Sequence, residues 1–350
     1  MSVTASIAEG QALTPVTAWA VGSKEAALAA LRPWWAQRVE RSGLGDEWLD
    51  VESAVDAVAP EPLPRMDSNA ALPYDAHALG LSYVEALPAG ERSEHGRHYT
   101  PSQLAQQLWA MAREALGYGV DTQRLHGLVR DPAVGAGALL VPVLREHLKA
   151  SRDTDPAFVL ASLPQFIEGI DTDPWAVYVA NVILAAEMLP TLARVAPSRR
   201  HPLPALARVG NSLEEDLSPA LVWIMNPPYG RQRISAAQRA RFADSLFGHA
   251  NLYGMFMATA IRGVTGEGVV AALVPTSFFS GLYFHRLREQ LSERAPLRSL
   301  SFVHNRAGVF GGVLQETCLA VFTPRRVQRA EISRVRVERT PVAKVPSPRT

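Results

Sequence analysis

The sequence predicts an α/β fold built on a doubly wound, mostly parallel sheet. Two observations carry this prediction: short apolar runs alternate with helical patterns from about residue 97 to 323, and glycine-rich or polar turns follow several of the runs. Composition agrees, because 47% of the 350 residues are hydrophobic and 20% are charged, as in chains that bury a core. Fibrous and disordered architectures are thereby excluded.

Six apolar runs have the length and composition of buried strands, and most of the segments between them have helical apolar spacing. The expected strands are 127–131, 166–171, 221–225, 269–274, 300–303 and 318–322. The expected helices in the same part of the chain are 102–116, 139–150, 174–188 and 252–264. This alternation is what a parallel sheet with crossover helices requires.

The first 90 residues are expected to form a small helical region and a linker. Residues 23–40 have helical spacing after the capping residue Ser23, and Pro33 is expected to kink or divide that helix. Four prolines between 59 and 73 predict an extended connector, which a short helix over 75–87 follows. We therefore expect three parts, namely 1–90, 91–323 and 324–350.

Charge is balanced over the whole chain but not along it. Lys and Arg number 35 against 34 Asp and Glu, whereas the tail 324–350 holds eight basic and two acidic side chains. Alternation over 332–337 indicates a strand with one charged face. A solvated basic tail and a tail that contacts phosphates both remain open.

Several classes of protein are not expected. Cys318 is the one cysteine, and the sequence has neither Cys-x-x-Cys nor His-Glu-x-x-His, so we expect no internal disulfide and no metal site. No uninterrupted apolar run approaches the roughly 20 residues that span a bilayer, and the first residues do not resemble a signal peptide. The expected location is the cytoplasm, without a membrane partner.

The first segment that indicates chemistry is the turn after strand 127–131, with the sequence Asp-Pro-Ala-Val-Gly-Ala-Gly over 131–137. Glycines let a backbone approach a ligand closely at the carboxyl end of a parallel strand. The turn differs from the dinucleotide fingerprint, because Leu140 stands where a third glycine is needed, and it lacks the ending of a phosphate loop. Alone, it indicates only that a nucleotide-like ligand binds here.

The second segment is the carboxylate Asp171 at the end of the next strand. An acid at this position accepts hydrogen bonds from the two hydroxyls of a ribose. Asp173 precedes Pro174, and we expect its main role to be capping the following helix. Asp171 is therefore the candidate for binding ribose.

The third segment is Asn-Pro-Pro-Tyr over 226–229, which ends the apolar strand 221–225. Two prolines cannot continue a central strand, so the Asn226 side chain and the Pro227 carbonyl are presented as acceptors for a planar amino group. The ring of Tyr229 is then suited to stack on the ring that bears this group. A simple turn is the alternative, and the two upstream segments in the same order argue against it.

In this order, the three segments resemble those of the N6-adenine DNA methyltransferases that use S-adenosyl-L-methionine and whose cofactor-binding half comes first. Type I modification subunits, type IIG enzymes and Taq-like methylases have this arrangement. The resemblance covers residues 96–323 and implies a seven-stranded Rossmann-like methyltransferase sheet. It also implies S-adenosyl-L-methionine as cofactor, DNA as substrate, and methyl transfer to N6 of an adenine flipped out of the duplex.

The resemblance assigns roles to individual residues. The catalytic residues that it implies are Asn226, Pro227, Pro228, Tyr229 and Phe310, the last as a second aromatic ring against the flipped base. The cofactor-binding residues that it implies are Tyr99, Thr100, Pro101, Asp131, Pro132, Gly135, Gly137, Asp171, Asn211 and Ser212. Thr100 would meet the methionine carboxylate at a helix start, where anions are favoured.

The sequence departs from the family pattern at several positions. Val134 and Ala136 replace the usual Cys and Ser of the glycine turn, and both are small enough for binding to survive. Asn211 stands where the family often has an acid, so it would contact the cofactor adenine through an amide. The stretches 251–256 and 266–279 resemble the family segment that follows the catalytic motif.

No segment after Phe322 is long enough for the target-recognition domain that usually follows in this branch. We therefore expect recognition to reside in a partner specificity subunit, in a separate domain or in the N-terminal region, within a restriction-modification or phage-defence system. Three alternatives stay open. They are a protein-glutamine methyltransferase acting on release factors, a ribosomal RNA adenine methyltransferase, and a catalytically silent, methylase-like DNA-binding subunit.

Overall fold

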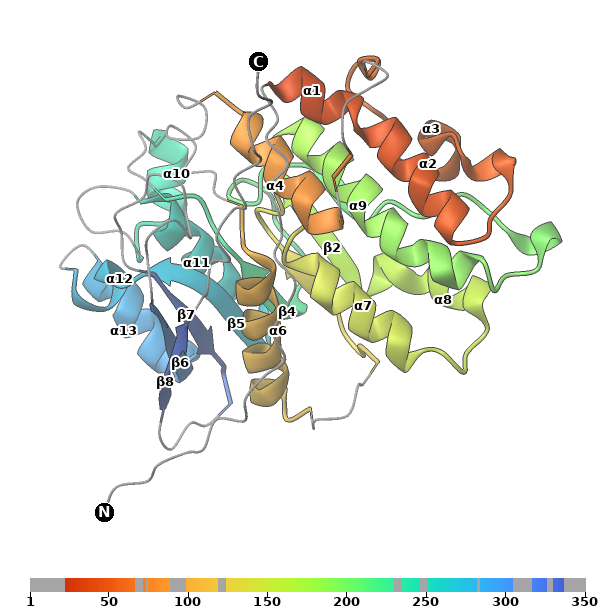
Figure 1. Ribbon diagram of the computed structural model, residues 1–350. Coiled ribbons are helices and arrows are strands. Elements are labelled where there is room, and N and C mark those ends of the chain that lie inside the picture. Colours follow the sequence, from red (N-terminus) through yellow and green to blue (C-terminus); the bar gives the residue numbers. More distant parts are fainter. Residues whose placement is uncertain are drawn as a thin grey trace.

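The computed structural model describes residues 23–66, 72–73, 75–88, 99–118, 124–229, 234–245, 251–281, 284–304, 317–325 and 330–336. An eight-stranded sheet in the order β3-β2-β1-β4-β5-β7-β6-β8 forms its centre (Figure 1). Strands β1 to β5 run parallel, β7 is antiparallel to both β5 and β6, and β8 joins parallel to β6. The strands are β1 Val129–Asp131, β2 Ile167–Asp171, β3 Ala207–Val209, β4 Ala220–Met225, β5 Val264–Pro275, β6 Leu297–His304, β7 Thr317–Phe322 and β8 Glu331–Arg336.

The predicted α/β sheet is confirmed, and all six expected strands occur within a few residues of their expected bounds. Strand β3 was not expected, because it has three residues and both Arg208 and Val209 are exposed, so it carries no apolar pattern. The expected number of seven strands is one too few. The eighth strand, β8, occupies part of the alternating stretch in the basic tail.

Helices lie on both faces of the sheet. They are α1 Lys24–Ala29, α2 Leu31–Arg41, α3 Val51–Ala54, α4 Ala76–Ala86, α6 Ser102–Leu116, α7 Leu140–Ala150, α8 Pro156–Ser162, α9 Pro174–Leu192, α10 Ala236–Arg241, α11 Leu252–Gly263, α12 Ser277–Ser280 and α13 His285–Arg294. Three 3₁₀ turns add η1 Asp46–Trp48, η2 Leu163–Gln165 and η3 Pro197–Arg199. Helix α9 runs four residues past its expected end and includes Pro190 in its last turn.

The first helical stretch divides, but not at the expected residue. Ser23 caps α1 by accepting a hydrogen bond from the Ala26 amide at 3.2 Å. The break falls at Ala30, and Pro33 lies in the first turn of α2, where a missing amide proton costs no helical hydrogen bond.

Two apolar clusters pack against the two faces of the sheet, and β4 shows how one strand serves both. Val222 and Ile224 join the larger cluster, which contains side chains of α1 to α4, α6, α7 and α9. Trp223 and Met225 point to the other face and join a cluster with α11 and α13. Figure 1 shows the N-terminal helices α1 to α3 packed outside α9. The N-terminal helices thus share a core with the sheet, and the division near residue 90 stays a prediction.

Helix α9 has 19 residues, and an 18-residue stretch of it has a mean hydropathy of 1.5, which is enough to cross a membrane by length and composition. In the structure, however, 78% of that stretch is buried inside the molecule. Its contacts with α2, α4, α7 and the strands β2 and β3 are those of a core helix.

Candidate active site

A cavity of about 400 Å³ opens at the carboxyl ends of the central parallel strands. Ten of the predicted site residues line it: Tyr99, Thr100, Asp131, Pro132, Gly135, Asp171, Asn211, Ser212, Asn226 and Pro228. Four others, Pro101, Gly137, Pro227 and Tyr229, belong to the same segments but do not line the cavity. Phe310 lies outside the described residues. Topology therefore brings segments 126 residues apart in the chain to one site.

The glycine turn after β1 depends on two residues with left-handed backbone conformations. Gly135 has φ +50° and Gly137 has φ +85°, a region that side chains other than glycine rarely adopt. A Cβ atom on Gly137 would lie 3.4 Å from Ala180 of α9, so this glycine also permits close packing of turn and helix. Gly135, by contrast, lies on the cavity wall, and a Cβ atom there would meet no atom within 4 Å. Its backbone amide faces the end of β2, where it donates to Asp171.

Backbone amides hold the carboxylate of Asp171 in place. Gly135 N donates to Asp171 Oδ2 and Asp173 N donates to Asp171 Oδ1, each at 2.9 Å. Asp173 caps α9 by accepting from Trp175 N at 2.9 Å, as expected from the sequence. The two oxygens of Asp171 retain lone pairs, so the carboxylate can still accept from hydroxyls in the cavity.

Asp131 is a second carboxylate at this edge, and it is only 1% exposed. Its Oδ1 accepts from Ala133 N at 3.1 Å. Burial raises the pKa of Asp131 to about 8, and the nearby charge of Asp171 adds to the rise. Asp131 therefore sits close to neutral charge at physiological pH, unless a cation in the cavity stabilises its charged form.

The loop after β3 forms the far side of the cavity and is tied to the turn after β1. Ser212 Oγ donates to the carbonyl of Pro132 at 2.8 Å. Asn211 Oδ1 accepts from Leu213 N at 3.1 Å, and Asn211 N donates to Glu215 Oε1 at 2.9 Å. Its side chain thus presents the amide group, not a carboxylate, to the cavity.

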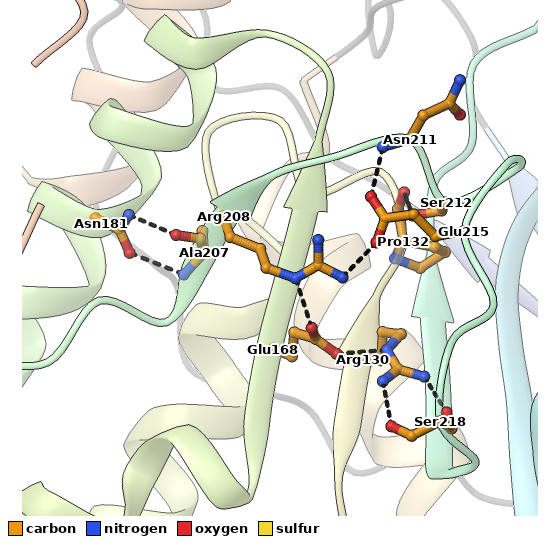
Figure 2. Close-up of polar contacts among 10 residues, drawn as sticks. All are labelled: Arg130, Pro132, Glu168, Asn181, Ala207, Arg208, Asn211, Ser212, Glu215 and Ser218. Atoms are coloured by element: carbon orange, nitrogen blue, oxygen red, sulfur yellow. Dashed lines mark hydrogen bonds and ion pairs between the residues drawn. The ribbon is translucent and has the colours of Figure 1, made fainter. Parts of the chain in front are cut away.

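Below this loop, a chain of ion pairs crosses the strands (Figure 2). Arg130, a buried cation, pairs with Glu168 at 2.6 Å, and Glu168 pairs with Arg208 at 2.9 Å. Arg208 in turn pairs with Glu215 at 2.7 Å, which reaches Asn211. At the other end, Arg130 donates to the carbonyl and hydroxyl of Ser218. Arg130 is the buried member of this chain, and the more exposed pair Arg208–Glu215 joins the loop to it.

The Asn-Pro-Pro-Tyr segment is held by side chains instead of backbone amides. Asn226 Nδ2 donates to Thr100 Oγ1 at 3.0 Å, which joins the end of β4 to the start of α6. The hydroxyl of Tyr229 lies 3.0 Å from Asn226 Oδ1 and 3.2 Å from the carbonyl of Leu273. Tyr229 is 8% exposed, and burial raises its pKa. The predicted stacking face of this ring is therefore buried in the structure, and its role against a base stays a prediction.

Sequence reasoning missed several residues of the cavity wall. Tyr83, Val84 and Leu87 come from the end of α4, a helix whose composition gave no sign of ligand binding. Gln238 of α10 also lines the wall. Leu252 and Phe256 of α11 lie in a stretch noted for its family resemblance, but no site role was predicted for them. Their helical spacing of four residues is the signal that could have identified a shared face.

The strand order and the cavity at the strand ends define a class I methyltransferase fold. A protein of Listeria monocytogenes described as a class I S-adenosylmethionine-dependent methyltransferase superposes with a TM-score of 0.52 at 14% identity, over 74% of this chain and 72% of that one. The type IIG restriction endonuclease BpuSI gives a TM-score of 0.57 at 18% identity, over 85% of this chain and 37% of that one.

The chain belongs to the N-6 DNA methylase family, whose model matches residues 82–338. The type II methyltransferase M.PstI of Providencia stuartii is 31% identical over 112 residues, which are 31% of this chain and 22% of that protein. The chain spans 21% to 38% of the length of the curated relatives that it matches.

S-adenosyl-L-methionine is the cofactor of this class, and the cavity residues suit it. The volume of the cavity lies within the range of small-molecule sites. The carboxylates Asp131 and Asp171 match the cationic and hydroxyl groups of the cofactor, and the glycine turn lets backbone approach it. Within the described ranges, no cluster of three His, Cys, Asp or Glu side chains is arranged for a metal.

Proposed function

We propose that the protein is a DNA methyltransferase that transfers the methyl group of S-adenosyl-L-methionine to N6 of a flipped-out adenine, in restriction-modification or phage defence. One observation carries the proposal: Asn226 lies on the wall of the same cavity as Asp131 and Asp171. A methyl donor bound by the carboxylates would therefore lie beside the amide that is suited to hold the acceptor. Family membership supports DNA as the substrate.

The residues of this chain would act by orienting and polarising the adenine amino group. Asn226 Oδ1 and the Pro227 carbonyl accept its two hydrogens, which draws the nitrogen lone pair out of the ring system. When bound, S-adenosyl-L-methionine supplies an electrophilic methyl group on a sulfonium. Asn226 and Pro227 would hold the amino nitrogen in line with that methyl group, and the methylated nitrogen would release its proton to water. Tyr229 and Phe310 are proposed to stack on the base.

The Tyr229 hydroxyl has a supporting role in this scheme. It lies within hydrogen-bond distance of Asn226 Oδ1, while Thr100 accepts from Asn226 Nδ2. Both ends of the amide are thus held, so the acceptor oxygen has a fixed direction before a base arrives. Target recognition is proposed to come from a specificity subunit or a separate recognition domain.

The testing experiment is transfer of labelled methyl from S-adenosyl-L-methionine to unmethylated genomic DNA, followed by digestion to nucleosides and mass analysis. We expect N6-methyladenine with the wild-type chain and none with Asn226→Ala. Asn226→Asp is the matched control, because it keeps an acceptor oxygen but loses the amide that donates to Thr100.

Release factor and ribosomal RNA serve as parallel substrates. Label in either of these, with none in DNA, would overturn the proposal in favour of that substrate. No label in any of the three, although the chain binds the cofactor and a specificity subunit from the native host is supplied, would indicate a silent DNA-binding subunit.

A further inference from the structure

Helix α4 lies before all of the predicted site segments, yet it meets the cavity at its C-terminal end. Tyr83 and Val84 of the last turn and the capping residue Leu87 line the same cavity as Asp171 and Thr100. The helix begins at Asp75, whose side chain accepts from Ala78 N at 2.7 Å. The start of α4 is therefore fixed by a cap, and its other end brings a polar side chain to the cavity.

The polar group is the hydroxyl of Tyr83, a side chain that is 2% exposed. It donates to Asp173 Oδ2 at 3.0 Å, across 90 residues of chain. Asp173 uses its other oxygen to cap α9 and its backbone amide to hold Asp171 Oδ1. Tyr83 is therefore one residue removed from the carboxylate that is proposed to bind ribose.

A second contact joins α4 to the segment before α6. A Cβ atom on Gly80 would lie 2.6 Å from the ring of Tyr99, so only glycine permits the approach. The ring of His77, on the same helix, is tilted against that of Tyr99, with centroids 4.8 Å apart. Tyr99 and Thr100 both line the cavity, and Thr100 binds Asn226. Helix α4 thus touches two separate elements of the cofactor site.

We propose that α4 is an integral wall of the S-adenosyl-L-methionine site and that Tyr83 is a positioning residue for it. Tyr83 holds Asp173, and Asp173 holds the Asp171 carboxylate in the orientation that a ribose needs. The N-terminal helical region is consequently part of the cofactor site, not only a packing layer. This inference rests on the cofactor of the proposed function and is independent of the DNA substrate.

The test is calorimetric titration of the full chain with S-adenosyl-L-methionine, comparing wild type, Tyr83→Phe and Tyr178→Phe. Tyr178 is an equally buried tyrosine on α9 whose hydroxyl has no hydrogen-bond partner within the described part of the chain. We expect Tyr83→Phe to weaken binding about 5- to 10-fold, within the range for one lost hydrogen bond of typical strength, and Tyr178→Phe to change it less than about 2-fold.

Steady-state kinetics separates positioning from general damage. For Tyr83→Phe, KM for S-adenosyl-L-methionine should rise, whereas KM for DNA and kcat at saturating cofactor should stay at wild-type values. Unchanged affinity in Tyr83→Phe, or an equal loss in Tyr178→Phe, would overturn the proposal. A chain that binds the cofactor with these differences but methylates no DNA would contradict only the proposed function.

A double-mutant cycle tests the route through Asp171. If Tyr83 acts by orienting this carboxylate, Tyr83→Phe should cost much less affinity in an Asp171→Asn background than in wild type. Additive losses would contradict that route. Gly80→Ala supplies a separate check on the wall, because displacement of Tyr99 should lower cofactor affinity, and wild-type affinity in this variant would count against the wall.

Discussion

The two ends of the cavity are held together in different ways. At the end formed by β1, β2 and β3, backbone amides of Gly135 and Asp173 grip Asp171, and backbone turns shape the wall. At the β4 end, the contacts run from side chain to side chain, from Thr100 through Asn226 to Tyr229. At the first end the described contacts to Asp171 come from backbone amides, whereas at the second the described contacts to Asn226 come from side chains.

This difference teaches how a methyltransferase site separates its tasks. In the proposed scheme, the end formed by β1, β2 and β3 holds the cofactor and the β4 end holds the acceptor base. The side-chain contacts at the β4 end join three separate segments, those of Thr100, Asn226 and Leu273. Substitutions at the end formed by β1, β2 and β3 should therefore change cofactor affinity, and substitutions at the β4 end should change the rate of methyl transfer.

The largest effect is expected for Asn226→Ala at the β4 end. The variant removes one of the two proposed acceptors for the adenine amino group, so kcat should fall on the order of 100- to 1,000-fold. Affinity for S-adenosyl-L-methionine should stay within about threefold of wild type, because the variant leaves the contacts of Asp171 in place and removes only the donor to Thr100. Calorimetric titration beside a methyl-transfer assay checks both values. A large loss of cofactor affinity in Asn226→Ala would erase the distinction between the two ends.

The converse variant is Asp171→Ala at the β2 end. It removes the proposed ribose acceptor and the partner of two backbone amides, so cofactor affinity should fall by roughly 30- to 100-fold. Asp171→Asn keeps one acceptor oxygen and should lose less. Both values come from equilibrium titration of the purified chain. If Asp171→Ala bound the cofactor as wild type does, ribose recognition would have to be assigned elsewhere.

A smaller effect is expected for Tyr229→Phe, which keeps the ring and removes the hydroxyl. Asn226 Oδ1 loses one donor, so kcat should fall about 3- to 10-fold without a change in cofactor affinity. Single-turnover methylation of DNA measures the chemical step directly. A wild-type rate would show that the hydroxyl bonds chiefly to Leu273.

The smallest effect concerns the pH dependence of stability without cofactor. The pKa of Asp131 rises from 3.8 to about 8 in the fold, so the folded state binds more protons than the unfolded state between these values. Stability contributed by protonated Asp131 is therefore present at low pH and lost as pH rises towards 8. Asp131→Asn cannot titrate, so its melting temperature should gain on wild type between pH 5.5 and 8. If the melting temperatures of Asp131→Asn and wild type changed equally with pH, the raised pKa of Asp131 would be contradicted.

Much of the fold was predictable because its elements carry local signals. Helix α6 has the bounds that its apolar spacing predicts, and β5 contains an uninterrupted apolar run that is buried on both faces. Strand β3 was not predictable, because its pairing with β2 decides its conformation, not its three residues. The break at Ala30 instead of Pro33 has a similar cause, since the first turn of α2 tolerates proline.

The residues of the candidate site likewise differ in whether a local sequence signal predicts them. The glycine turn, Asp171 and Asn226 stand at strand ends, so their convergence followed from the parallel sheet. Tyr83 gave no signal, because its contact with Asp173 depends on how α4 packs on α9, which no local pattern encodes. Phe310 was inferred from family resemblance alone and lies outside the described residues, so its role stays a prediction.

The reactivity of the lone cysteine can report how often the sheet opens. Cys318 lies on β7 in the middle of the sheet, is fully buried, and directs its thiol to the carbonyl of Val274. Burial raises the pKa of this thiol to about 12, so almost no reactive thiolate exists while the sheet is closed. Alkylation by a thiol reagent therefore reports how often β5 and β7 separate, and cofactor or DNA that slows it must bind the closed sheet preferentially.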